Sequence, residues 1–243
     1  MFDFLEDANE QATLLAVKKR LRTDRDALLS ECETKASSAD AAALKATLKR
    51  LDTDVVNHLT QLARQARQCA ETLPMPRGVF VKEDDRARAY THLLNTLPTM
   101  HRSTQTLNAS IANFLQFEQI AAKRRQNALA AEVLIGATLL AMKECSDDSS
   151  HCVSSIYDQL KLENRRADEL TAIASSHTAL LLAFSKNTLV AFFVRIEQVA
   201  DLQNHGRAAD PSSIVNLTNR LAREADLLID EILLSQANAS SFQ

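Results

Sequence analysis

LKATLKRLDTDVVNHLTQLARQARQCAETL, residues 44–73, carries the pattern that decides the fold. Its apolar residues recur three or four positions apart, which places them on one stripe of an α-helix. This is the heptad pattern of helices that pack along their length, with one extra step near Leu59. The stretch therefore predicts a long helix buried along one side. The members of this seam are Leu44, Leu48, Leu51, Val55, Leu59, Leu62, Ala66, Cys69 and Leu73.

The rest of the chain shows the same kind of spacing. Four further helical segments are predicted, over about 3–35, 84–142, 153–204 and from 210 onward. Only three glycines and four prolines occur in 243 residues, so the chain has few points at which a helix must stop. The sequence thus predicts an all-α fold, an elongated antiparallel helical bundle or coiled-coil-like rod of four to five long helices.

The breaks between segments suggest a domain organisation. Residues 1–75 are expected to form an N-terminal helical hairpin, with the link at 37–40 returning the chain antiparallel to its first helix. Residues 76–83 form a linker that contains proline and glycine. Residues 84–236 are expected to form a long antiparallel hairpin plus a C-terminal helix, packed with 1–75 as one bundle, and 237–243 a frayed tail. Pro98 predicts a kink or short break in the third segment.

The composition excludes several classes of function. The formal charge of −3 gives no overall attraction to nucleic acid, and no aromatic residues are interleaved with the basic clusters. The isolated glycines exclude phosphate-binding loops and nucleophile elbows, so we expect neither a cofactor nor enzymatic activity. The N-terminus lacks the features of a secretory signal, and four cysteines suggest free thiols, so we expect a cytoplasmic protein.

The histidines do not predict a metal site. Among those on predicted helices, only His58 and His205 follow an aspartate by four residues, and no second carboxylate pattern completes a cage. We therefore interpret the helical histidines as solvated or capping residues.

CSDDSSHC, residues 145–152, is the one cluster of reactive residue types. The favoured interpretation is a plain turn between antiparallel helices, because serine and aspartate suit helix ends. A redox-sensitive or structural disulfide between Cys145 and Cys152 is geometrically possible. A metal site is disfavoured, because adjacent His151 and Cys152 would have difficulty pointing to one ion.

Two stretches are unusually apolar, residues 129–142 and 178–194. Both fall short of the roughly 20 uninterrupted apolar residues that a bilayer-spanning helix needs. The favoured interpretation is a central helix contacted on several sides. The alternative is a concealed membrane-active hairpin.

Basic residues cluster at two places, and a solvated helix face is the favoured interpretation of both. The alternative is a surface that binds lipid head groups or a protein partner. The residues concerned are Lys18, Arg22 and Arg25 in the first helix and Lys123, Arg124 and Arg125 in the third.

The expected function is that of a non-enzymatic helical scaffold or adaptor. It would act through protein–protein contacts of its helix faces, as a homo- or hetero-oligomer. The alternative function is that of a peripheral membrane-binding or membrane-active protein, which binds or remodels lipid or acts like a pore or translocator component.

Overall fold

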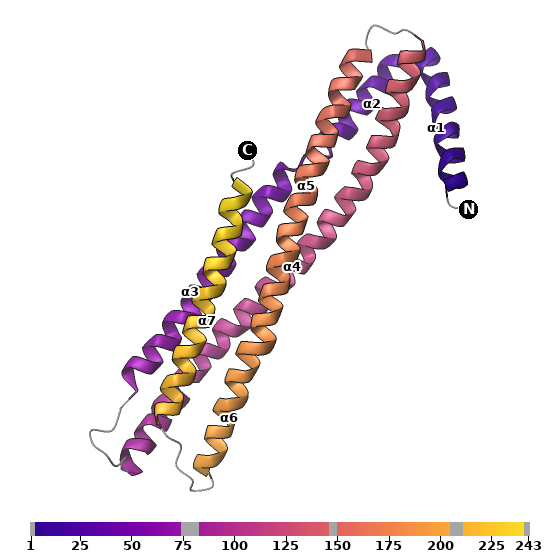
Figure 1. Cartoon of the computed structure of the whole chain (residues 1–243). Helices are drawn as coiled ribbons and strands as arrows, with labels where there is room; N and C mark the ends of the chain where they lie inside the picture. The colour runs from indigo at the N-terminus through magenta and orange to yellow at the C-terminus, as the bar shows by residue number, and fades with distance from the viewer. Residues whose placement is uncertain (1–2, 74–82, 146–149, 205–210, 241–243) are drawn as a thin grey trace. The chain divides into compact units, whose positions relative to one another are not determined.

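The computed structural model describes residues 3–73, 83–145, 150–204 and 211–240, and all regular secondary structure in these ranges is helical (Figure 1). The all-α helical bundle predicted from the sequence is confirmed. The elements are α1 (Asp3–Thr23), α2 (Arg25–Ser37), α3 (Ala42–Thr72), α4 (Glu83–Glu144), α5 (Ser150–Phe184), the π-helical turn η1 (Ser185–Leu189), α6 (Val190–Asn204) and α7 (Pro211–Ser240).

The chain packs as two compact units that share its long helices. Unit 1 comprises Met1–Leu48 and Phe117–Ala172, and unit 2 comprises Lys49–Gln116 and Ile173–Gln243. α3, α4 and α5 therefore each contribute one part to unit 1 and another to unit 2. The domain ranges expected from the sequence stay a prediction.

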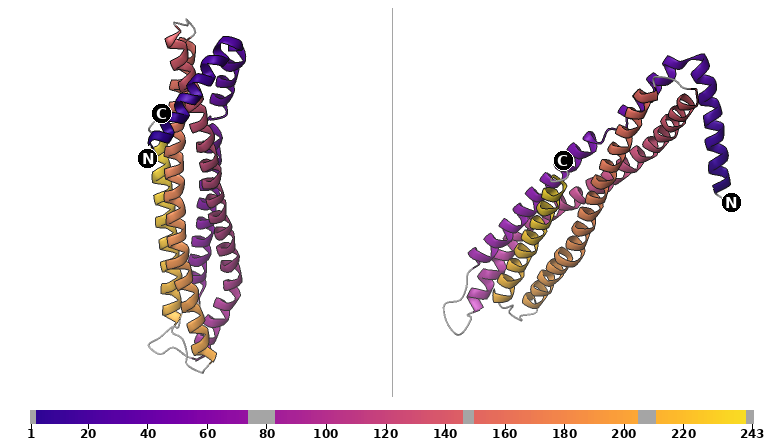
Figure 2. Two further views of the ribbon diagram at one scale, coloured as in Figure 1. Left: turned by 90° about the vertical axis from the view of Figure 1, so that its right-hand side faces the viewer. Right: turned by 45° about the horizontal axis from the view of Figure 1, so that its top comes forward.

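Unit 2 is an antiparallel arrangement of four helical segments, which lie side by side in every view (Figures 1 and 2). Along α3, His58 bonds Ser110 of α4 and Gln65 bonds Ser103, so the two helices run in opposite directions. α7 runs opposite to α5 and η1, because it meets them first at Thr188 and later at His177. The unit is thus an up-and-down bundle, the arrangement that favours helices with one apolar stripe each.

Unit 1 contains α1, α2 and the parts of α4 and α5 that adjoin the turn at 145–150. One apolar cluster fills its interior. Gly136 of α4 lies beside the Tyr157 ring of α5, where an added Cβ would be 3.5 Å from the nearest ring carbon. The cluster comprises Val17, Leu21, Leu28, Cys32, Ala39, Ala128, Ala131, Ile135, Ala141, Met142, Val153 and Leu160.

The predicted seam of α3 is buried along its whole length. Each of its nine apolar residues, from Leu44 to Leu73, is at most 5% exposed. This follows from the heptad spacing, because residues three and four apart face the same neighbours on a helix.

The chain reverses direction earlier than the sequence suggested. Asp24 leaves the helical conformation with φ −155° and ψ 66°, which ends α1 and starts α2. Arg20 then donates to the Glu31 carboxylate at 2.7 Å, so α2 folds back along α1. The reversal therefore lies at Asp24, and the expected one at 37–40 is wrong: α2 and α3 each run antiparallel to α4.

α4 continues through Pro98 without interruption, so a break at this position is wrong, whereas the alternative of a kink stays a prediction. Proline removes one backbone N–H and leaves the carbonyl of Leu94 without its helical partner. Both residues are exposed, so water can reach this side of the helix. On its other side, Leu93 and Met100 are fully buried and hold the helix in place.

η1 is a single π-helical turn between α5 and α6. Phe184 and Leu189 are both buried although they are five positions apart. The neighbouring buried residues before and after them are spaced three or four positions apart. A π turn accommodates one additional residue in this way.

Several expectations fall on parts of the chain outside the described residues. These are the linker over 76–82, the centre of the turn at 146–149, His205, and residues 241–243 of the tail. Residues 237–240 of the expected frayed tail belong to α7.

Candidate functional site

The outward side of α5, η1 and α6 in unit 2 is apolar and exposed. Leu182 is 47% exposed, Val190 54% and Val194 45%. The interpretation of residues 178–194 as a central helix is therefore wrong, because one apolar side of the segment is uncovered. Leu129, Val133 and Leu140 of the other apolar stretch are also exposed.

By length and composition, Ser150–Val199 is able to cross a membrane. It contains an 18-residue window of mean hydropathy 1.6, and 28% of that window is buried. Core helices of soluble proteins pass the same test, but they are mostly buried. Length and composition therefore do not by themselves make this segment a membrane span.

α7 also exposes apolar residues. Leu227 is 61% exposed and Leu234 is 65% exposed, and their spacing of seven positions places both on one side of the helix. Arg223, Asp230 and Glu231 lie on the same side, and none of the three makes an ion pair with another residue that the structure describes. We call these five residues the α7 seam.

The interior of unit 2 holds a polar chain of three residues. His177 of α5 is fully buried, and its Nδ1 donates to Oδ1 of Asp52 on α3 at 2.8 Å. Its Nε2 bonds the hydroxyl of Ser235 on α7. The Phe114 ring of α4 meets the imidazole edge-on, with centroids 6.2 Å apart. His177 thus contacts all three remaining helical segments of unit 2, which are α3, α4 and α7.

The Ser235 hydroxyl has two possible acceptors. Its Oγ lies 3.0 Å from the Ile232 carbonyl of its own helix and also bonds Nε2 of His177. Its single proton can be donated to either of them.

Asp, His and Ser in this order form the relay of serine hydrolases. In that relay the serine oxygen is open to a substrate, and the histidine removes its proton. Here the imidazole is closed to solvent. The geometry is that of a structural relay that joins three helices.

Sequence reasoning missed this relay. His177 was interpreted as solvated or capping, which its burial contradicts. Other histidines contact neighbouring helices from less buried positions: His58 bonds Ser110 at 2.9 Å, and His92 bonds Thr72 at 2.8 Å. Within the described ranges, no group of three or more His, Cys, Asp or Glu is arranged to hold a metal ion.

The cysteines of the turn lie at the two helix ends that flank it. Cys145 follows the last residue of α4 and Cys152 is in the first turn of α5. Both are exposed and carry free thiols, whereas Cys32 and Cys69 are buried. Burial raises the pKa of both buried thiols, despite hydrogen bonds to Thr138 and Thr96.

The predicted basic residues of the first helix lie in or beside α1. Lys18 pairs with Glu144, at the end of α4. Arg22 is exposed, and Arg25 is partly buried. The side chains of this cluster therefore do not all face solvent.

The second basic cluster divides between the surface and the interior. Lys123 is exposed, and Arg125 lies 3.7 Å from Asp168. Arg124 points inward: its guanidinium donates to the carbonyls of Ala39 and Glu163, and its Nε is buried without a hydrogen-bond partner among the described atoms. Burial lowers the pKa of Arg124, although nearby acids oppose this effect.

The carboxylate of Glu163 completes this joint in unit 1. It accepts the backbone N–H of Ala41 at 3.0 Å and a hydrogen bond from Arg166 at 2.6 Å. The link between α2 and α3 is thereby held to α4 and α5 at once. Arg124 therefore serves the fold, and the exposed basic residues of this cluster are Lys123 and Arg125.

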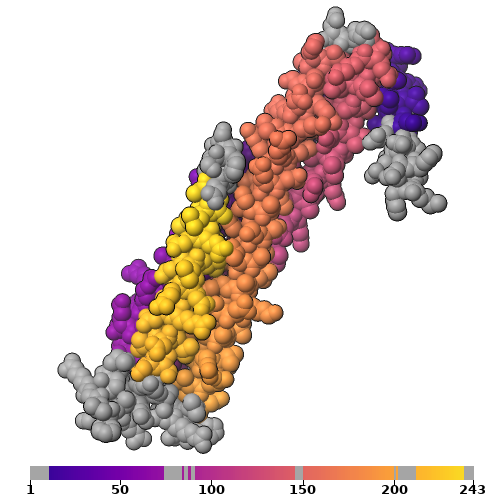
Figure 3. Space-filling view, in the orientation of Figure 1, coloured from indigo at the N-terminus to yellow at the C-terminus, as the bar shows by residue number. Residues whose placement is uncertain are grey.

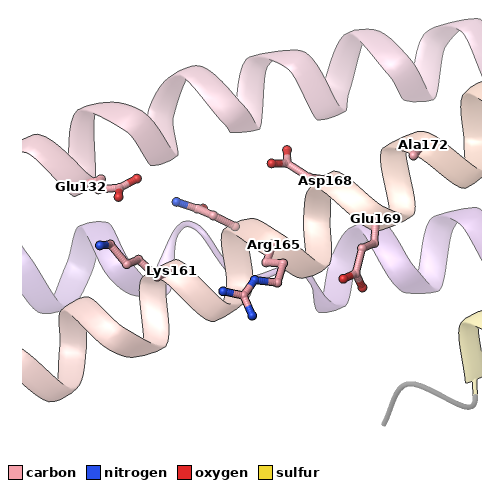
Figure 4. Close-up of a pocket in the computed structure, with 7 residues that line it drawn as sticks. Glu132, Lys161, Arg165, Asp168, Glu169 and Ala172 are labelled. Carbon is pink, nitrogen blue, oxygen red and sulfur yellow. The ribbon is translucent and has the colours of Figure 1, made fainter.

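A shallow, open groove of about 540 Å³ lies between α4 and α5 in unit 1. Both acidic and basic side chains line it, among them Lys161, Asp168 and Glu169. Arg165 and Glu169 project to one side of α5 and Asp168 to the other (Figure 4). These groups do not converge on one point, so the groove is a solvated charged surface.

Comparison with known proteins assigns no family. No family model, no curated protein and no solved structure shows a significant match to this chain.

Proposed function

We propose that this chain is a non-enzymatic helical scaffold that assembles with a second copy of itself through the α7 seam. The observation that carries the proposal is the pair of leucines at heptad spacing, Leu227 and Leu234, which are the two most exposed residues of α7 among its large apolar side chains. A seam of this kind normally packs against another helix.

The charges of the seam favour a second copy as the partner. When two α7 helices pair antiparallel with Leu227 opposite its own counterpart, Arg223 of each copy comes opposite Glu231 of the other. In the same register Asp230 comes opposite Glu224 and Leu234 opposite Arg220. The complementarity therefore rests on the two Arg223–Glu231 pairs that two-fold symmetry creates, and two-fold symmetry is that of most small assemblies.

The test is light scattering coupled to size-exclusion chromatography of the full chain at increasing concentration. We expect a dimer that Leu227→Glu converts to a monomer, because two carboxylates would then face each other at the symmetry axis. Arg223→Glu should weaken the dimer, and the double variant Arg223→Glu, Glu231→Arg should restore it.

Val190→Glu is the matched control, because it adds a carboxylate to an equally exposed apolar position on α6. It should leave the dimer intact. A wild-type chain that is monomeric throughout, or a double variant that fails to recover, would overturn the proposal.

A further inference from the structure

Two neighbouring segments of unit 2 contain no acidic residue. Residues 86–116 of α4 lack aspartate and glutamate, and so do residues 173–196 of α5, η1 and α6. α3 and α7, which complete the unit, carry both signs of charge. The acid-free segments therefore differ from the rest of the bundle in charge as well as in apolar exposure.

The two acid-free segments lie side by side. The rings of His101 on α4 and Phe193 on α6 are stacked with their centroids 4.1 Å apart. Further along, Ser185 of η1 donates to Asn108 of α4 at 3.4 Å. Their outward sides thus adjoin at two places.

The surface they share holds five apolar residues together with a histidine, an asparagine and one lysine. We define the acid-free face as Leu94, His101, Asn108 and Leu115 of α4 together with Leu182, Lys186, Val190 and Val194 of α5, η1 and α6. All of these side chains are exposed, and α5 and α6 run along the visible side of the molecule beside α7 (Figure 3).

The charge pattern distinguishes the partners that could cover this face. A partner helix in a coiled coil is usually selected by flanking charges of both signs, as on the α7 seam. Within the acid-free segments the charges are positive, among them those of Lys186, Arg102 and Arg195. The exposed Glu197 follows Val194 by three positions, just beyond the end of the second segment. Apolar side chains flanked mainly by basic residues are typical of helices that lie in the surface of an anionic bilayer.

The packing of the helices favours contact along the surface over insertion across it. The other side of the same segment is joined to α7, where Thr188 donates to Glu224, and to the relay at His177. A helix lying in the interface keeps these bonds, whereas a spanning helix would have to give them up.

From these observations we propose that the acid-free face docks on an anionic lipid bilayer. Leu182, Val190 and Val194 enter the boundary between head groups and acyl chains. Lys186 extends its ammonium group to the lipid phosphates and carboxylates.

The test is co-sedimentation of the full chain with vesicles of phosphatidylcholine containing phosphatidylserine, compared with phosphatidylcholine alone. We expect binding to the anionic vesicles that weakens with added salt. Lys186→Ala should lower partitioning about fivefold, since one basic residue near such a surface contributes about that factor. Val190→Glu should lower it further.

Leu227→Glu is the matched control, because it places the same charge on α7, outside the acid-free face. It should bind vesicles like the wild type, even where it abolishes self-association. Circular dichroism of each variant checks that the helices are retained.

Three results would overturn this proposal. One is a chain that does not sediment with anionic vesicles at low salt. Another is a Val190→Glu variant that binds as well as the wild type. The third is a loss of self-association in Val190→Glu, because the face would then be covered by protein. The first two leave the α7 seam untouched, so the two proposals fail separately.

Discussion

Nδ1 of His177 lies 2.8 Å from Oδ1 of Asp52, and both side chains are closed to solvent inside unit 2. Removing one partner of a buried pair leaves the other without compensation. We expect Asp52→Ala to lower the free energy of unfolding by about 3–5 kcal/mol, measured by urea denaturation. Ser235→Ala should lower it by only about 1 kcal/mol, because one hydrogen bond is lost.

The exposed Asp54, two residues along α3, supplies the control for this pair. Asp54→Ala should change the free energy of unfolding by at most about 0.5 kcal/mol. Equal effects of Asp52→Ala and Asp54→Ala would show that the relay does not stabilise the bundle.

Arg124 should stabilise unit 1 through the link between α2 and α3. Arg124→Met removes its hydrogen bonds to the Ala39 and Glu163 carbonyls, and we expect a loss of about 2 kcal/mol. Hydrogen exchange at the Ala41 amide, which bonds Glu163, should become faster. Arg125→Met, whose ion pair is exposed, should have less than about 1 kcal/mol of effect. An unchanged Ala41 exchange rate in Arg124→Met would show that Arg124 does not hold the link between α2 and α3.

The four thiols should separate into two classes of reactivity. Cys145 and Cys152 are exposed, whereas burial excludes reagents from Cys32 and Cys69 and raises their pKa, which reduces the reactive thiolate. Mass spectrometry after brief alkylation should show two modified cysteines in the native protein and four in urea. The variant Cys145→Ser, Cys152→Ser should show none in the native state; rapid native labelling of Cys69 would contradict its burial.

Glu224 should make a pH-dependent contribution to stability. Hydrogen bonds from Thr188 and Arg220 hold the pKa of its carboxyl below the ordinary value of 4.5. Such a group stabilises the fold above the pKa of the unfolded chain and loses this effect as the pH falls through its folded value.

We therefore expect Glu224→Gln to lower the melting temperature at pH 7 by at most about 2–4 °C. The difference from wild type should shrink as the pH falls from about 5 to 2. Glu197→Gln, at an exposed position of α6, is the matched control. A Glu224→Gln difference that is the same at both ends of this range would contradict the assigned hydrogen bonds.

Much of the fold is predictable from local spacing. The α3 seam is buried from Leu44 to Leu73 because heptad spacing depends only on helix geometry. The start of α7 at Pro211 follows from the rigidity of proline at a helix N-terminus. The break at Asp24 was missed because the apolar spacing runs on across it, from Leu21 to Leu28.

The relay was less accessible to sequence reasoning, although a signal was present. Asp52, His177 and Ser235 each occupy a position three or four residues from buried apolar neighbours on the same helix. A polar residue at such a position needs a partner. The identity of that partner could not be predicted from the sequence, because His177 is 125 residues from Asp52 and 58 from Ser235.

The exposure of residues 178–194 could not be predicted for a different reason. Hydropathy records what a helix could bury, whereas exposure depends on how many neighbours the fold supplies. In unit 2 these neighbours are α3, α4 and α7, and they leave the side with Leu182 and Val190 uncovered.

The π turn at Ser185–Leu189 means that the bundle has a place where the chain is one residue longer than its packing requires. Deleting a residue from a packed helix normally rotates all following residues by about 100° about the helix axis, which turns buried side chains away from the core. Here, loss of Asn187 would bring Phe184 and Leu189 to ordinary helical spacing and leave Phe192 and Ile196 facing inward. This turn is therefore where the chain can change length without changing its core.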